Sequence, residues 1–341
     1  MKLISFTVPC YNSENYMRKC VDSLLTGGDD VEIIIVNDGS HDGTLEIARD
    51  YEQKFPDIVR VIDKENGGHG SGVNAGLTVA TGLYYKVVDS DDWVDERALA
   101  ELIDTIKQHR ADDALPDLYI TDFVYFHAAD NTSHVSSYEK KFPVRKLCTW
   151  DKVKKFKYSH MLLMHALMYK REKLIESDTV LPEHTFYVDN YFAYKPLPFM
   201  KTVYYLDVQL YQYYIGREDQ SVNRKNFVKR YAQQVKVMKC MTDSFTWREI
   251  KHMPKGLRNY MWHALEVIMM NTIYFICADN SKERHEALKD LWLHIKAHDK
   301  QLYKRLRHRS YALIVNYMPW GLRSFVMTVG YNILCKKVKL G

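Results

Sequence analysis

The stretch that decides the fold is Tyr84-Tyr85-Lys86-Val87-Val88-Asp89-Ser90-Asp91-Asp92. Its apolar first part, residues 84–88, predicts a strand, and three carboxylates follow directly. Carboxylates packed this closely repel one another, and a hard divalent cation with oxygen ligands relieves that repulsion. The same residues also suit the N-terminal cap of a helix over residues 93–108. The cluster by itself therefore predicts either a metal site or a helix cap.

The rest of the first 110 residues alternates between strand and helix patterns. The strand-like runs are residues 3–8, 31–36, 58–62 and 84–88. Because apolar residues at helical spacing separate them, we predict the α/β class with a doubly wound, mainly parallel sheet. Ligands of such sheets bind where the strands end. The segments that follow the four strands are residues 9–12, 37–44, 64–72 and 89–92.

Composition limits the class of protein. The chain has 341 residues, of which 46% are apolar and 27% charged, so disordered and collagen-like classes are excluded. The length predicts either two domains or one large α/β domain with an appendage. The six cysteines form no C-x-x-C pair, which argues against a zinc site and favours reduced thiols in a cytoplasmic protein. No secretory signal precedes the first strand and no run of about 18 apolar residues occurs, so we expect no spanning helix.

Charge divides the chain near residue 226. Residues 227–341 contain 21 Lys and Arg against 8 Asp and Glu, whereas the residues before them carry a net charge of −8. The later part has only helical spacing, so we predict a basic helical region at 227–341. Such helices fit peripheral contact with an anionic membrane. The alternative is a helical cap with a solvated basic face, or a dimer interface. We expect no nucleic acid partner because no nucleic-acid motif accompanies the charge.

Two more of the segments that follow strands carry chemistry. Asn37-Asp38-Gly39-Ser40 places a carboxylate where it can accept from a base or ribose donor, although these residues also suit a turn and a helix cap. The run Asn66-Gly67-Gly68-His69-Gly70-Ser71-Gly72 contains the spacing of a dinucleotide fingerprint, completed by Ala75. Two strand–helix units precede it, so we interpret that match as coincidental. The backbone N–H groups of this turn are still able to bind phosphate or an acceptor.

Four motifs stand in order along the chain, each after a predicted strand. They are Val8-Pro9-Cys10-Tyr11-Asn12, Asn37-Asp38-Gly39-Ser40 with Asp42-Gly43-Thr44, Asn66-Gly67-Gly68 with Asn74-x-Gly76, and Asp89-Ser90-Asp91-Asp92. Together they resemble the motif set of family 2 inverting glycosyltransferases with the GT-A fold, of the kind that builds bacterial polysaccharides or lipid-linked glycans. The resemblance implies a GT-A catalytic domain at 1–226, with a nucleotide-sugar-binding half at 1–110 and an acceptor-binding half at 111–226.

The resemblance implies a site for a UDP-sugar donor. Tyr11 would stack on the base, Asp38 would accept from its imide N–H, and Asp89 would contact the ribose. Mg²⁺ or Mn²⁺, held by Asp91 and Asp89, would neutralise charge on the departing diphosphate. The residues implied to bind the donor are Pro9, Tyr11, Asn12, Asp38, Gly39, Ser40, Asn66, Gly67, Gly68, Asp89, Ser90 and Arg217.

An inverting transfer needs one base to take the proton from the acceptor hydroxyl. Residues 186–192 resemble the base motif of the family, with Asp189 in the base position and Val188 where Glu often stands; Asp189 also suits a helix N-cap. Arg217 lies in a segment resembling one whose arginine closes over the diphosphate, and a guanidinium suits that task. The residues expected near the acceptor are His69, His184 and Trp93.

We therefore predict a metal-dependent inverting transferase that moves a hexose from a UDP-sugar to a hydroxyl of a glycan or lipid-linked acceptor. We expect it in the cytoplasm, with peripheral contact at the inner face of the cell membrane as one reading of its basic helices. Two alternatives stay open: a sugar-nucleotide nucleotidyltransferase on a related sheet, and a catalytically degenerate scaffold that binds nucleotide sugars. The first normally has a glycine-rich loop with a basic residue after its first strand, and residues 9–12 are not such a loop.

Overall fold

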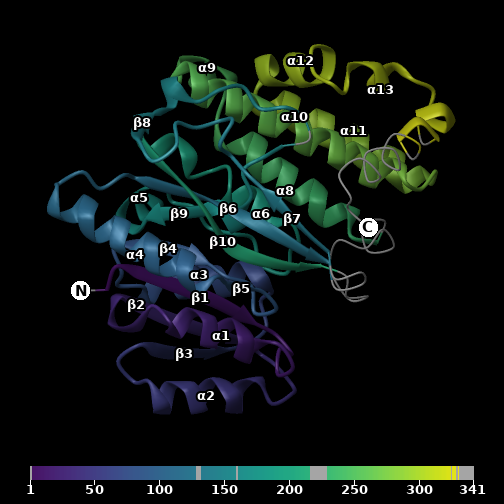
Figure 1. The fold of residues 1–341 in the computed structure, drawn as a ribbon. Coiled ribbons are helices and arrows are strands. Elements are labelled where there is room, and N and C mark those ends of the chain that lie inside the picture. The colour runs from purple at the N-terminus through teal and green to yellow at the C-terminus, as the bar shows by residue number, and fades with distance from the viewer. Residues whose placement is uncertain are drawn as a thin grey trace. The chain divides into compact units, whose positions relative to one another are not determined.

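The computed structural model describes residues 2–127, 132–158, 160–215, 229–323, 325–327 and 329 (Figure 1). The chain divides into two compact units. The first unit contains the described residues of Met1–Lys154, Leu162–His184 and Pro196–Ile215. The second contains those of Lys155–Met161, Thr185–Lys195 and Gly216–Gly341. The predicted boundary at residue 226 lies outside the described residues and stays a prediction.

The first unit is built on one mixed sheet. Its strands are β1 (Ile4–Cys10), β2 (Val31–Asp38), β3 (Val59–Lys64), β4 (Tyr84–Val87), β5 (Trp93–Val94), β6 (Leu118–His127), β7 (Thr132–Ser136), β8 (Leu147–Thr149), β9 (Leu167–Lys170) and β10 (Thr202–Ile215). Their order is β3-β2-β1-β4-β9-β6-β10-β5, with β7 paired to β6 and β8 to β10. The first four strands are mutually parallel, as predicted, whereas β9 runs antiparallel to both β4 and β6. The α/β class with a mainly parallel sheet is confirmed.

Helices in the first unit connect and cover the strands. They are α1 (Met17–Leu25), α2 (Thr44–Lys54), α3 (His69–Val79), α4 (Glu96–Ala111) and α5 (Arg171–Glu176), with the 3-10 turns η1 (Gly28–Asp30), η2 (Trp150–Lys152), η3 (Met164–Ala166) and η4 (Leu197–Phe199). On α1, the predicted apolar stripe is buried, including Met17, Val21 and Leu24. All of β1 is buried, and so is most of β2. The core therefore lies between the parallel strands and their helices, and it holds the ends of β1, β2 and β4 in fixed positions.

The helix after the carboxylate cluster begins later than predicted. Trp93 and Val94 form β5, which pairs antiparallel with β10. The N-cap of α4 is Asp95, whose side chain accepts a hydrogen bond from the N–H of Ala98. The interpretation of Asp89-Ser90-Asp91-Asp92 as a cap of the helix 93–108 is therefore wrong, and these carboxylates need another explanation.

The described part of the second unit is helical. Its helices are α6 (Val188–Phe192), α8 (Tyr231–Ser244), α9 (Trp247–His252), α10 (Lys255–Cys277), α11 (Lys282–His298), α12 (Lys300–His308) and α13 (Leu313–Tyr317). The long helix α10 is buried along most of its length and packs against α8 and α11 (Figure 1). Among the described residues, no helix combines the length and the apolar character needed to span a membrane.

Candidate active site

The segments that follow β1, β2 and β4 are joined by hydrogen bonds at one edge of the sheet. The Asn12 N–H donates to Ser40 Oγ at 3.0 Å, and the His41 N–H donates to Asn12 Oδ1 at 2.9 Å. The hydroxyls of Ser13 and Ser90 are 2.8 Å apart and share a hydrogen bond. The structure thus brings together three of the residues singled out in the sequence: Asn12, Ser40 and Ser90.

Pro9 and Tyr11 belong to the same edge. Pro9 packs closely against α3, since a Cβ placed on Gly72 would lie 3.0 Å from Pro9 Cβ. Tyr11 follows β1 and is 50% exposed. Stacking against another flat group stabilises an exposed aromatic ring. Tyr11 therefore offers a stacking surface beside the strand ends.

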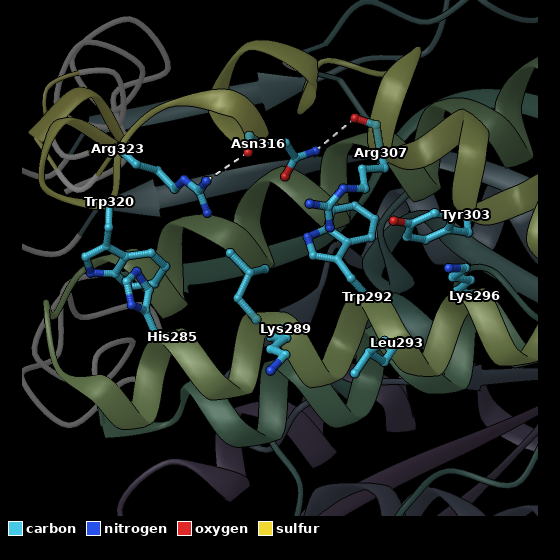
Figure 2. Close-up of a pocket in the computed structure, with 11 residues that line it drawn as sticks. His285, Lys289, Trp292, Leu293, Lys296, Tyr303, Arg307, Asn316, Trp320 and Arg323 are labelled. Atoms are coloured by element: carbon cyan, nitrogen blue, oxygen red, sulfur yellow. Dashed lines mark hydrogen bonds between the residues drawn. The ribbon is translucent and has the colours of Figure 1, made fainter.

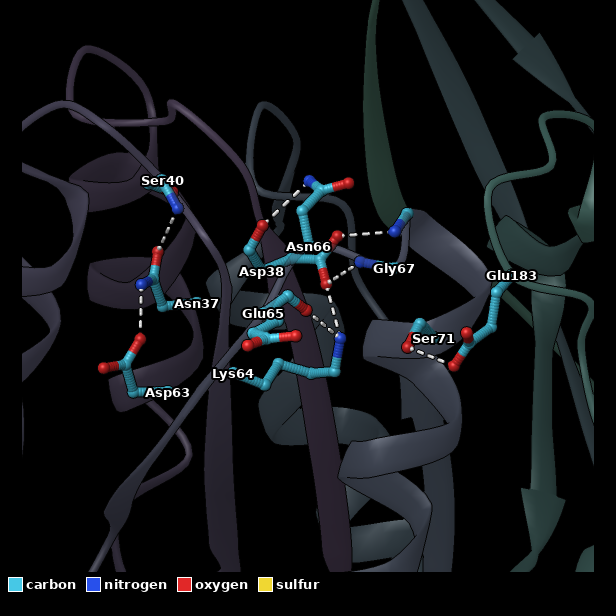
Figure 3. Close-up of polar contacts among 11 residues, drawn as sticks. Asn37, Asp38, Ser40, Asp63, Lys64, Glu65, Asn66, Gly67, Ser71 and Glu183 are labelled. Atoms are coloured by element: carbon cyan, nitrogen blue, oxygen red, sulfur yellow. Dashed lines mark hydrogen bonds and ion pairs between the residues drawn. The ribbon is translucent and has the colours of Figure 1, made fainter.

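Asp38 orders the turn that follows β3. Its buried carboxylate accepts from the Gly67 N–H at 2.9 Å and the Gly68 N–H at 2.7 Å, and from Lys64 Nζ at 2.8 Å (Figure 3). Asn66 Nδ2 donates to the carbonyl of Asp38 at 2.9 Å. Two N–H groups of the glycine-rich turn are thus engaged by a carboxylate of the protein. Whether Asp38 also accepts from a base stays a prediction.

Gly39 fits this arrangement because it has no side chain. Its φ is +69°, in the left-handed region that favours glycine, and a Cβ would lie 2.8 Å from the Asn66 nitrogen. Next to it, Asn37 Nδ2 donates to Asp63 Oδ1 at 2.7 Å (Figure 3). The loops after β2 and β3 therefore form one packed corner.

The segment 181–184 lies against the glycine-rich turn and α3. Asn74 exchanges two hydrogen bonds with the backbone of Leu181, at 2.8 and 2.9 Å. Ser71 Oγ donates to Glu183 Oε1 at 3.1 Å (Figure 3). The His184 N–H donates to the Gly67 carbonyl at 2.6 Å. The structure therefore places His184 beside the turn, and its role toward an acceptor stays a prediction.

Asp89 is flanked by two histidines. His69 Nε2 is 2.7 Å from Asp89 Oδ1, and His165 Nε2 is 3.8 Å from Asp89 Oδ2. Burial alone would raise the pKa of Asp89, but His69 and His165 outweigh it and hold the pKa below its ordinary value. His69, predicted near the acceptor, is thus a partner of the carboxylate cluster.

Asp92 is the buried member of the cluster. Asp92 is 1% exposed, and its carboxylate accepts from the Tyr211 hydroxyl at 2.5 Å and from the Tyr214 N–H at 2.8 Å. Burial, together with the charges of Asp91 and Asp89, raises the pKa of Asp92 well above its ordinary value. A cation bound next to Asp92 would stabilise the ionised form of its carboxylate.

One group of side chains in this part of the chain fits a divalent metal. Ligand atoms of Asp89, Asp92 and His165 all lie within 4.8 Å of one another. His165 is 5% exposed, and its Nδ1 is buried with no hydrogen-bond partner among the described residues. Carboxylate oxygens with an imidazole nitrogen suit Mn²⁺, and the oxygens also suit Mg²⁺. Of the predicted metal pair, Asp89 belongs to this group; Asp91 does not, and its role stays a prediction.

The comparisons identify the family. Residues 5–173 match the model of glycosyl transferase family 2. The chain belongs to this family. It is 31% identical over 226 residues to the glycosyltransferase GlyA of Streptococcus pneumoniae, covering 63% of this chain and 31% of that protein. It is 42% identical over 111 residues to the uncharacterized glycosyltransferase EpsJ of Bacillus subtilis, covering 32% of each. The matches thus span about a third of these relatives' length.

Solved structures of similar fold support a GT-A-like fold for this chain. The crystal structure of residues 1–349 of Staphylococcus aureus TarS has a TM-score of 0.62 at 20% identity, covering 90% of this chain and 86% of that one. The complex of the same TarS fragment with UDP-GlcNAc has a TM-score of 0.63 at 21% identity. At this level of identity, the likeness establishes the fold.

Trp93 is packed against neighbouring side chains. Lys19 Nζ lies 2.9 Å from the centroid of its ring, and the Phe126 ring meets it edge-on at 5.8 Å. Burial lowers the pKa of Lys19 from its ordinary value. A cation over an aromatic face is a stabilising contact. A contact between Trp93 and an acceptor stays a prediction.

Asp189 lies in the first turn of α6, in the second unit. The N-cap of this helix is Tyr187, at φ +65°, so the reading of Asp189 as the cap is wrong. Val188, Tyr191 and Phe192 are buried, whereas Asp189 is half-buried and accepts from Asn190 Nδ2 at 3.3 Å. The buried residues anchor the helix and leave the carboxylate partly accessible. Arg217, the other predicted residue of the later chain, lies outside the described residues.

Sequence reasoning missed two members of the site. Asp92 is part of the quoted cluster, but nothing in its spacing separates its role from that of Asp91. His165 lies in η3, directly before β9, and β9 pairs antiparallel with both β4 and β6. A lone histidine among apolar residues carries no local signal of a ligand, so only the fold reveals its position beside Asp89.

Proposed function

We propose that the chain transfers a hexose from a UDP-sugar to a hydroxyl of a glycan or lipid-linked acceptor, with inversion at the anomeric carbon. The observation that carries this proposal is the cluster of Asp89, Asp92 and His165 in a family 2 chain whose β1 is followed by the exposed Tyr11. TarS, a neighbour in fold, was solved with UDP-GlcNAc, which supports a UDP-sugar as donor.

In this proposal, Tyr11 stacks on the uracil base and Asp38 contacts it while also keeping the Gly67–Gly68 turn ordered. The half-buried Asp89 accepts from the ribose. Ser40 and Ser90 lie in loops that hydrogen-bond to the segment after β1, and in this proposal their hydroxyls contact the same ligand. Arg217 pairs with the diphosphate, since its guanidinium matches phosphate oxygens.

Asp89, Asp92 and His165 would hold Mg²⁺ or Mn²⁺, with Asp91 adjacent in the chain. When bound, such an ion neutralises charge on a nucleoside diphosphate leaving group. The chain supplies the orientation of these ligands. His69 fixes one oxygen of Asp89, while Tyr211 and Tyr214 fix both oxygens of Asp92.

Asp189 is the proposed general base. A carboxylate in the first turn of a short anchored helix has a defined direction, and it remains accessible to an acceptor hydroxyl. Taking the proton from that hydroxyl as it attacks the sugar makes the oxygen a better nucleophile. In this proposal, His184 and Trp93 contact the acceptor.

We further propose that the basic helical region touches an anionic membrane. Large apolar side chains are exposed there, among them Ile314 at 68%, Tyr317 at 65% and Phe325 at 66%. Apolar groups next to cations favour the interface of an anionic bilayer. Ile314→Asp should lower co-sedimentation with phosphatidylglycerol vesicles. The control Val180→Asp alters a 66% exposed apolar residue of the first unit, and an equal loss in both variants would contradict the proposal.

The proposed activity is tested by two measurements on the full chain. Isothermal titration calorimetry should detect UDP binding that strengthens with Mn²⁺ and weakens in Tyr11→Ala, but not in Tyr16→Ala. With a panel of UDP-sugars and glycan acceptors, a transferase releases UDP. A nucleotidyltransferase instead forms pyrophosphate from UTP and a sugar phosphate. Absence of UDP binding, or pyrophosphate release without UDP release, would overturn the proposal.

A further inference from the structure

The second unit contains a pocket of about 350 Å³ between α11, α12, α13 and the residues that follow α13 (Figure 2). Along α11, the lining residues Lys289, Trp292 and Lys296 follow one another at helical spacing. Arg307 from α12 and Asn316 from α13 line the opposite side. The volume is in the range of pockets that hold small ligands.

The lining is cationic. Lys289, Lys296, Arg307 and Arg323 line the pocket, and none of the described lining residues is acidic. Burial, reinforced by the charge of Arg307 and opposed by Cys277, lowers the pKa of Arg323. An arginine nonetheless keeps its charge at physiological pH. Because no carboxylate lines the pocket in the described part of the chain, its positive potential favours an anionic ligand.

Three buried polar atoms at the pocket lack hydrogen-bond partners within the described residues: Asn316 Oδ1, Trp320 Nε1 and Arg323 Nε. Arg323 Nη2 donates to the carbonyls of Asn316 and Met318, at 2.9 and 3.1 Å, but Arg323 Nε is buried without an acceptor. Asn316 is 7% exposed, and its Nδ2 donates to the Arg307 carbonyl at 3.1 Å, but its Oδ1 is buried without a donor. Buried polar groups without partners are costly, so a ligand that supplies both an acceptor and a donor would be favoured.

Aromatic rings complete the lining. Trp292, Tyr303 and Trp320 contribute flat faces, and Arg307 lies 5.5 Å from the Trp292 centroid and 5.8 Å from the Tyr303 centroid (Figure 2). A bare inorganic anion would contact the cations but would leave these faces and Asn316 Oδ1 unused. A ligand with a carbon skeleton, hydroxyl groups and an anionic group would contact the aromatic faces, Asn316 Oδ1 and the cations together.

We propose that this pocket binds a phosphate ester that carries free hydroxyl groups, such as a sugar phosphate or a polyol phosphate. The phosphate oxygens accept from Arg323 Nε and pair with Lys289 and Lys296. A hydroxyl group donates to Asn316 Oδ1, and the carbon skeleton packs against the aromatic faces. The ligand has two possible sources, a phosphorylated glycan or the headgroup of a phospholipid. The proposal needs no glycosyl transfer and goes beyond the proposed function.

The test is isothermal titration calorimetry of the full chain with sn-glycerol 3-phosphate, without UDP-sugar or metal. We expect this probe to bind more tightly than glycerol, which lacks the phosphate, and than inorganic phosphate, which lacks the skeleton. Lys289→Gln should weaken binding about tenfold, in line with the loss of a charge-assisted contact. The matched control is Lys304→Gln, an exposed lysine of α12 that does not line the pocket. Asn316→Asp, which adds a negative charge at the buried acceptor, is a second variant and should abolish binding.

Equal affinity for the three probes, or equal weakening in Lys289→Gln and Lys304→Gln, would overturn the proposal. Vesicles distinguish the two sources. Co-sedimentation with phosphatidylglycerol vesicles that Lys289→Gln reduces and Lys304→Gln does not assigns the pocket to a lipid headgroup. Binding of glycerol 3-phosphate without any such reduction assigns it to a phosphorylated glycan. Because no donor is present, failure of this test leaves UDP binding and transfer to be judged by their own measurements.

Discussion

The carboxylate of Asp38 accepts a hydrogen bond from the backbone N–H of Gly67 at 2.9 Å, across 29 positions of sequence. The same carboxylate binds the next N–H and the ammonium of Lys64. One side chain at the end of β2 thus sets the conformation of the turn after β3. Hydrogen bonds to an ionised acceptor are stronger than those between neutral groups, so the turn is held firmly.

Asp38→Asn should destabilise the protein and weaken UDP binding. An amide has one acceptor oxygen, and its NH₂ group would face an N–H donor, so at least one buried donor loses its partner at a cost of about 1–3 kcal/mol. Urea unfolding measures the stability change. Asp63→Asn is the control, because Asp63 is exposed and accepts from a single side chain, Asn37. An equal loss in both variants would contradict the role of Asp38.

Gly39→Ala should be more destabilising than Gly28→Ala. Both glycines have positive φ, +69° and +56°, so both substitutions carry the backbone cost of the left-handed region. Only at Gly39 would the new Cβ meet another atom, the Asn66 nitrogen at 2.8 Å, whereas nothing lies within 4 Å at Gly28. The difference between the two free energies of unfolding isolates the clash, which we expect to be about 1–3 kcal/mol. No difference would mean that the corner between the loops is loosely packed.

The first four strands were predictable because each is a local apolar run followed by polar residues. The start of α4 was not predictable in the same way. Trp93 and Val94 have the apolar character of a helix face, but they pair with Tyr211 and Gln212 of β10. Local spacing does not report a strand partner more than a hundred residues away. The observed N-cap is therefore Asp95 and not a residue of the carboxylate cluster.

The site was predictable only in part, for the same reason. Motif order placed Asn12, Ser40 and Ser90 at one sheet edge, and the hydrogen bonds between their loops agree. The partners of each carboxylate depend on which strand lies next to it. Asp92 meets Tyr211 because β10 crosses to that edge, and Asp89 meets His165 because η3 precedes the inserted strand β9.

His165→Asn should weaken Mn²⁺ binding about tenfold or more. The variant keeps a polar side chain but removes the imidazole nitrogen that lies with the oxygens of Asp89 and Asp92. Electron paramagnetic resonance of free Mn²⁺ in a titration gives the dissociation constant. His134→Asn is the control, since His134 is exposed on β7. Unchanged Mn²⁺ affinity in a folded His165→Asn protein, together with lost affinity in Asp91→Asn, would favour the pair Asp89 and Asp91 instead.

Asp189→Asn should lower kcat by about 10²–10⁴ while UDP binding stays the same. The amide preserves the size of the side chain but cannot take a proton, so the loss falls on the chemical step. Steady-state UDP release gives kcat and KM, and calorimetry gives the UDP affinity. Asp151→Asn, at an exposed carboxylate in η2, should behave as the unaltered protein. Wild-type turnover in Asp189→Asn would reject this base.

Glu266→Gln should stabilise the protein at pH 8 more than at pH 5. Burial raises the pKa of Glu266 from 4.5 to about 7, although Lys155, the Trp262 indole and the Tyr311 backbone oppose the rise. The native state therefore holds an extra proton between these two values, and its stability falls as the pH rises from about 4.5 to about 7. Glutamine stays neutral and removes that loss, which is on the order of 2 kcal/mol.

Urea unfolding at the two pH values measures the effect of Glu266→Gln. The exposed Glu286 of α11 provides the control, because Glu286→Gln should change stability by similar amounts at both pH values. Burial, with a smaller effect of the Glu266 charge, raises the pKa of Tyr158 to about 12, so this phenol stays neutral across the range. A stability gain in Glu266→Gln that does not grow with pH would mean that Glu266 is already ionised at pH 5 in the folded protein.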